Sequence, residues 1–168
     1  IISPTDIILL WDKPNILNSN NISYQYQLKC PIKMSHTGLM NFNGSTSGDT
    51  YANLSNVIPN HNYQFRVSAC SSMGCSLFTD WYNFTTIEGI PGVPFNLHLD
   101  YINYHLATLN WEPPINPNGI ISQYELRYIK GPVIRSVNVS THLTTNITDL
   151  LPYTKYIVQV RAYTNYGH

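Results

Sequence analysis

The feature that most constrains the fold is an internal repeat, because the chain carries one pattern twice in tandem. Residues 54–70 (LSNVIPNHNYQFRVSAC) align without gaps with residues 147–163 (ITDLLPYTKYIVQVRAY). Further upstream, ISYQYQLKC (22–30) aligns with ISQYELRY (121–128), and IILLWDKP (7–14) aligns with LATLNWEPP (106–114). The three blocks occur in the same order in both copies, so the sequence predicts two related structural units.

The repeated blocks have the periodicity of β-strands. In the first copy the apolar side chains Tyr63, Phe65, Val67 and Ala69 alternate with polar ones, which is the pattern of a strand buried on one face. Turn sequences such as PPINPNG and KGP interrupt the chain often, and helical periodicity is absent. Many short strands separated by turns indicate an all-β sandwich in each copy.

These blocks resemble the fibronectin type III module, and the resemblance covers nearly the whole chain. Trp11 and Trp111 match the buried tryptophan of strand B, and Tyr26 and Tyr124 match the tyrosine of strand C. The L-x-P-x-x-x-Y signature of the E–F corner is matched twice, by Leu54, Pro59 and Tyr63 and by Ile147, Pro152 and Tyr156. In this fold the corner tyrosine fills the core and its hydroxyl contacts the upstream backbone.

The resemblance therefore implies two immunoglobulin-like β-sandwiches in tandem, over residues 1–88 and 89–168, with TIEGIPGVP (86–94) between them. Few residues precede the strand of Trp11, and few follow the strand of Tyr156. We accordingly expect both modules to be incomplete, the first lacking most of strand A and the second lacking strand G.

The composition favours an extracellular protein. Charged residues make up 11% of the chain, the formal net charge is zero, and no apolar run approaches the length of a membrane-spanning helix. A neutral chain has no basic surface for nucleic acid, and we expect no membrane insertion in this segment. Six N-x-S/T sequons are candidate glycosylation sites, at Asn21, Asn43, Asn53, Asn83, Asn138 and Asn146. Asn53 and Asn146 are equivalent, and both are expected to face solvent from strand E, leaving the opposite sheet, or the elbow between the modules, for contacts.

The cysteines raise three alternatives: a redox centre, a metal site or a disulfide. Cys70 and Cys75 are too far apart for a thioredoxin-type motif, and no second ligand pair at zinc spacing accompanies them. In a fibronectin type III module they would lie at the end of strand F and the start of strand G, which favours a Cys70–Cys75 disulfide. Cys30 is then expected to be a free buried thiol, or to bond a module outside this chain.

No catalytic pattern is evident. Asp12 and Glu112 follow the equivalent tryptophans, so the fold explains their recurrence better than acid–base pairing does. Nucleophile-elbow, zinc-protease and phosphate-binding motifs are absent from the sequence. We predict neither an enzyme nor a cofactor or metal site.

We expect a structural and adhesive role: presenting surfaces to other extracellular proteins and to neighbouring modules of a secreted or single-pass membrane protein. Candidate contact residues near the F–G turn are Met73, Phe78, Trp81 and Tyr82, although packing of alternate members on the module is the simpler interpretation. The cysteine-clamped turn resembles usherin-type ectodomains, while the second module is equally similar to those of receptor tyrosine phosphatases or sevenless-type receptor kinases. The alternative function is a ligand-binding elbow of a cell-surface receptor.

Overall fold

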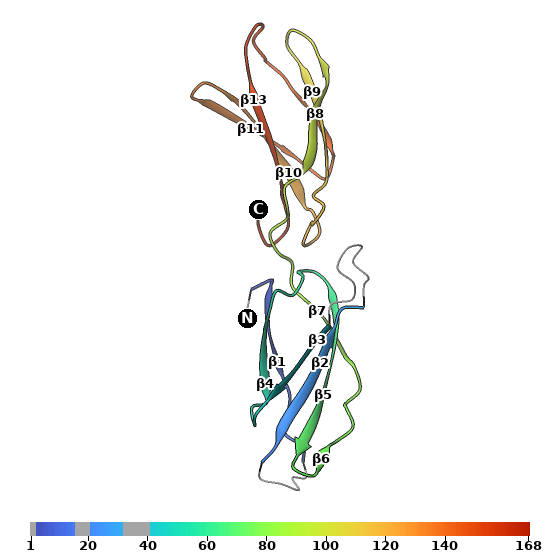
Figure 1. The fold of residues 1–168 in the computed structure, drawn as a ribbon. Helices are drawn as coiled ribbons and strands as arrows, with labels where there is room; N and C mark the ends of the chain where they lie inside the picture. The colour runs from blue at the N-terminus through green and yellow to red at the C-terminus, as the bar shows by residue number, and fades with distance from the viewer. Residues whose placement is uncertain (1–2, 16–20, 32–40) are drawn as a thin grey trace. The chain divides into compact units, whose positions relative to one another are not determined.

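A computed structural model describes residues 3–15, 21–31 and 41–168 of the chain. It divides into two compact units, Ile1–Ile87 and Glu88–His168. The described residues form antiparallel β-sheets and contain no helix (Figure 1). The all-β prediction is therefore confirmed.

Unit 1 folds into two sheets. Its strands are β1 (Asp6–Leu10), β2 (Ser23–Lys29), β3 (Asn41–Thr46), β4 (Tyr51–Ser55), β5 (Asn62–Ser71), β6 (Gly74–Cys75) and β7 (Tyr82–Thr85). Strands β1 and β4 form the first sheet, and the second has the order β3-β2-β5, with both β6 and β7 paired to β5. The core between the sheets contains the buried Leu9, Leu28, Val57, Tyr63 and Phe65.

Unit 2 repeats this arrangement. Its strands are β8 (Phe95–Ile102), β9 (Ala107–Glu112), β10 (Gln123–Lys130), β11 (Val133–Val139), β12 (Thr144–Ile147) and β13 (Ile157–Tyr163). The sheets have the orders β12-β9-β8 and β11-β10-β13. Trp111, Tyr124 and Leu126 are buried between them.

The two tryptophans occupy equivalent places in the two units, but the expected match of Tyr26 to Tyr124 is wrong, because Tyr24 pairs with Ala69 as Tyr124 pairs with Ala162. Trp11 contacts Tyr24 edge to face with ring centroids 5.6 Å apart, and Trp111 contacts Tyr124 in the same way at 5.6 Å. Tyr26 is only half-buried, and it lies across the neighbouring strand at Gly44, where a Cβ would collide with its ring. A glycine at this position lets the tyrosine close the edge of the core.

The two units differ at their edges. In unit 2, β8 pairs with the outer edge of β9, whereas the described residues of unit 1 place no equivalent strand beside β1. In unit 1, β6 and β7 pair with the outer edge of β5, whereas the described part of unit 2 has no such strand beside β13. As a result, Phe84 of β7 stacks on Tyr63, which is fully buried, while the equivalent Tyr156 is half-exposed.

Candidate protein-contact surface

The β5–β6 hairpin of unit 1 is closed by a covalent bond. Cys70 and Cys75 are cross-strand partners and form a disulfide across the Ser71–Gly74 turn. Gly74 has a φ of 130°, a conformation that side chains with a Cβ rarely adopt, so the turn needs glycine here. The expected pairing is thus present, and Cys30 is a free, fully buried thiol.

The strand register also excludes the other pairing of Cys70 within this unit, a disulfide with Cys30. Cys70 pairs with Ser23 at the start of β2, and Cys30 lies beyond Lys29 at its other end. Seven residues of extended strand separate the two ends by roughly 23 Å, far beyond the reach of a disulfide.

After Cys75 the chain follows β5 without regular strand pairing. The Ser76 amide donates to the Ala69 carbonyl at 2.8 Å, and the Thr79 amide donates to the Val67 carbonyl at 2.9 Å. Side-chain hydroxyls complete the pairing: Ser76 Oγ accepts from the Ala69 amide, and Thr79 Oγ1 accepts from the Val67 amide. The segment is therefore anchored at two points, and its path between them is irregular.

Aromatic and cationic side chains brace this irregular segment, in a cluster that we call the ladder, formed by Lys29, Arg66, Phe78 and Trp81. Lys29 Nζ lies 3.9 Å from the centre of the Trp81 ring, and Arg66 Cζ lies 4.3 Å from it. Arg66 Cζ is also 4.5 Å from the centre of the Phe78 ring, and its Nε donates to Gln27 Oε1 at 2.8 Å. Contacts of this kind are favourable because the ring face is electron-rich.

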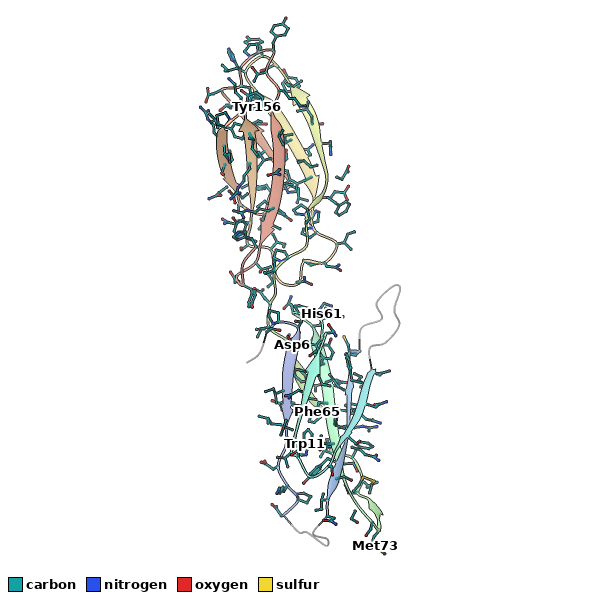
Figure 2. The ribbon with its side chains drawn as sticks, turned by 60° about the vertical axis from the view of Figure 1, so that its left-hand side comes forward. Asp6, Trp11, His61, Phe65, Met73 and Tyr156 are labelled. Atoms are coloured by element: carbon teal, nitrogen blue, oxygen red, sulfur yellow. A yellow bond between two sulfur atoms is a disulfide. The ribbon has the colours of Figure 1, made fainter. Side chains whose placement is uncertain are left out.

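The four expected contact residues divide into two groups. Phe78 and Trp81 are half-buried in the ladder, so for them packing on the module is what the structure shows. Met73 is 94% exposed at the hairpin tip, and Tyr82 is 68% exposed on β7. Figure 2 shows Met73 and His61 at opposite ends of unit 1. Leu77, which the sequence did not single out, is 93% exposed beside the hairpin.

All six sequon asparagines are exposed: Asn21, Asn43, Asn53, Asn83, Asn138 and Asn146. Asn53 lies on β4 and Asn146 on β12, at equivalent positions that face solvent. The opposite sheet of each unit also carries candidate glycosylation sites, because Asn43 lies on β3, Asn83 on β7 and Asn138 on β11. The sequence argument compared one pair of sequons and did not place the others on strands.

Unit 2 carries a charged network on the outer face of β10 and β13. The Glu125 carboxylate accepts from Arg127 Nε at 2.9 Å, from Arg161 Nε at 2.6 Å and from the Tyr163 hydroxyl at 2.6 Å. Hydrogen bonds from these donors lower the pKa of Glu125 to about 2, and the bond from the Tyr163 hydroxyl has the largest effect. The same hydrogen bond raises the pKa of Tyr163. Glu125 thus stays ionised and ties the two strands together.

The chain was compared with known families. The family model for the fibronectin type III domain matches residues 1–85 and again residues 92–168. The chain belongs to the fibronectin type III family. As modules of this family the two units are structural, and as part of an ectodomain they are extracellular.

The chain is also similar to parts of several much longer proteins. The chain is 33% identical to human neural cell adhesion molecule L1 over 123 residues, which is 68% of the chain and 10% of that protein. It is 34% identical to mouse ephrin type-B receptor 3 over 120 residues, 68% of the chain and 12% of the receptor. It is 29% identical to human usherin over 166 residues, 98% of the chain and 3% of usherin. The chain therefore spans a small fraction of each relative.

The fibronectin type III corner is built the same way in both modules. The Tyr63 hydroxyl accepts a hydrogen bond from the Ile58 amide at 2.8 Å, and the Tyr156 hydroxyl accepts one from the Leu151 amide at 3.0 Å. Burial raises the pKa of Tyr63. In both modules the tyrosine hydroxyl thus accepts a hydrogen bond from a backbone amide of the corner.

Sequence reasoning missed the ladder cations and the Glu125 network. Lys29, Arg66, Arg127 and Arg161 all lie at outward strand positions, which ordinarily indicate only solvent exposure. Their partners become visible once the register places them beside aromatic or acidic side chains. Within residues 3–15, 21–31 and 41–168, no helix has the length and apolarity to cross a membrane, and no group of three or more potential metal ligands gathers.

Proposed function

We propose that this chain is an extracellular structural and adhesive pair of modules that presents protein contact surfaces within a larger ectodomain. The observation that supports this most directly is the β5–β6 hairpin of unit 1. It is closed by the Cys70–Cys75 disulfide, the ladder braces the segment that follows it, and it exposes the apolar side chain of Met73 at its tip. A rigid loop with an exposed apolar anchor loses little conformational entropy when it binds.

The test is cell-surface binding of the fluorescent, tetramerised chain. We expect tetramers to stain cells that display the partner protein, and staining to disappear after surface proteins are digested with trypsin. The double substitution M73S/L77S should reduce staining several-fold, while S72A, at a neighbouring exposed position of the same turn, should leave it unchanged. Staining that survives trypsin, or that ignores M73S/L77S, would refute the assignment of the hairpin.

A second candidate is a ligand-binding region of a cell-surface receptor, which is supported by the similarity to ephrin type-B receptor 3. This alternative requires a soluble protein ligand whose affinity depends on both modules together. Surface plasmon resonance with the pair and with each module alone distinguishes the two functions. An adhesive hairpin acts within unit 1, whereas a receptor elbow loses its affinity when the modules are separated.

A further inference from the structure

The outer face of the β1–β4 sheet carries an exposed apolar patch, formed by Ile8, Leu10 and Tyr51. Ile8 is 46% exposed, Leu10 73% and Tyr51 46%, while the alternate residue Leu9 points into the core. Leu10 and Tyr51 are cross-strand partners, so the three side chains share one face. Clustered exposed apolar side chains of this kind are usually covered by something in a folded protein.

A glycosylation sequon lies within this patch. Asn53 is the cross-strand partner of Ile8, it is exposed, and it begins the sequon Asn53-Leu54-Ser55. Paired residues of antiparallel strands project from the same face with their Cβ atoms about 5 Å apart. A sugar attached to the Asn53 amide nitrogen therefore starts beside Ile8 and within reach of Leu10 and Tyr51.

Unit 2 provides an internal comparison. Aligning Trp11 with Trp111 places Thr108 at the position of Ile8 and Asn110 at the position of Leu10. The equivalent sequon residue, Asn146, pairs with Thr108, and its side-chain oxygen accepts a hydrogen bond from the Thr108 hydroxyl at 2.8 Å. The second module thus has the same sequon beside polar residues of β9, and the exposed aromatic side chain on that face, Tyr101, lies one strand further away on β8.

We propose that an N-linked glycan at Asn53 packs its first N-acetylglucosamine residues over Ile8, Leu10 and Tyr51, and so shields an apolar patch that the sandwich leaves exposed. The sugar suits this role because its ring presents C–H groups and an acetyl methyl on one side and hydroxyls on the other. It can therefore remove apolar area from water while keeping the outer surface hydrated. A glycan at Asn146 starts beside the polar Thr108 instead of an apolar side chain.

The competing occupant of this region is another polypeptide strand. The free edge of β1 borders a cleft whose lining includes Pro4, Ile8, Leu10, Phe84 and Ile87, and such a strand could enter it. A strand in that cleft reaches Ile8 and Leu10, but it leaves Tyr51 uncovered, because Tyr51 does not line the cleft. Asn53 pairs with Ile8 and lies two residues from Tyr51 along β4, which favours the glycan as the cover of the outer face.

The proposal is tested on the full chain secreted from glycosylating mammalian cells. Mass spectrometry of glycopeptides should show Asn53 occupied. N53Q should elute later than wild type from a hydrophobic interaction column and self-associate several-fold more strongly in sedimentation velocity. N146Q, the matched control, should do neither. Adding I8T and L10N to N53Q copies the polar residues of β9 and should restore wild-type elution.

Because N53Q could also impair secretion, glycans should be removed enzymatically from the folded wild-type protein and from I8T/L10N. Removal should raise the column retention of wild type more than that of I8T/L10N. An unoccupied Asn53 alongside other occupied sequons, equal behaviour of N53Q and N146Q, or equal retention changes in the enzymatic comparison would each overturn the proposal. Adhesion is not measured here, so the outcome is independent of the hairpin's role.

Discussion

At the scale of single residues, Glu125 shows how a polar position on a sheet face can become structural. Its carboxylate is held by two arginines and the Tyr163 hydroxyl, and the side chain of Glu125 is 8% exposed. Arg127 lies on β10 with Glu125, while Arg161 and Tyr163 lie on β13. The network therefore joins β10 to β13 in addition to the backbone hydrogen bonds between these strands. Charge-assisted hydrogen bonds of this kind are stronger than neutral ones.

The pKa of Glu125 leads to a prediction about acid stability. Its folded-state pKa of about 2 lies below the ordinary value of 4.5, so the carboxylate contributes stability that is fully present above pH 4.5. That contribution is lost as the pH falls from 4.5 towards 2. E125Q should therefore be less stable than wild type at neutral pH, and the difference should shrink over that interval. Urea unfolding of unit 2 as a function of pH measures it, with the exposed E112Q as a control that should show no comparable convergence.

At the scale of elements, the ladder holds the segment between Cys75 and Tyr82 against the sheet, where regular strand pairing is interrupted. Only the Ser76 and Thr79 amides of the segment 76–81 donate to the β5 backbone, while the Trp81 ring packs against Lys29 from β2 and Arg66 from β5. The side chains thus attach the segment to both β2 and β5, whereas its few backbone hydrogen bonds attach it to β5 alone.

We predict that W81L loosens this segment. Loss of two cation–ring contacts should cost about 1 kcal/mol, which corresponds to roughly five-fold faster amide exchange at Thr79. Y82L removes the neighbouring but 68% exposed aromatic ring and serves as the control. Hydrogen exchange monitored by NMR or mass spectrometry gives the rates. Equal protection in W81L and wild type would show that the disulfide and the backbone suffice.

The elements themselves were predictable because their signals are local and repeated. Alternation around Tyr63, the two corner prolines and the paired tryptophans predicted the sandwiches, and the Cys70–Cys75 spacing in a hairpin predicted the disulfide. The ladder and the apolar patch depend on which residue of one strand lies opposite which residue of another. That register is set by side chains distant in sequence, so no single stretch of the chain encodes it.

At the scale of the whole molecule, the repeat has produced two cores that share no residue, one around Tyr63 and one around Trp111. Each core has its own corner tyrosine, and the two corners differ in exposure. The Tyr63 hydroxyl bonds a part-buried amide, whereas the hydroxyl of Tyr156 bonds an exposed one. Removing the hydroxyl should therefore matter more in unit 1, because water can replace the lost acceptor in unit 2.

We predict that Y63F destabilises unit 1 by about 1–2 kcal/mol and that Y156F destabilises unit 2 by less than about 1 kcal/mol. In the double variant the two effects should add, because substitutions in separate cores do not share partners. Hydrogen exchange in increasing urea, read separately from peptides of residues 1–87 and 88–168, resolves the two units. If Y63F lowered the stability of unit 2 as much as that of unit 1, the tandem repeat would be one cooperative folding unit, and a variant in either corner would weaken every surface that the pair presents.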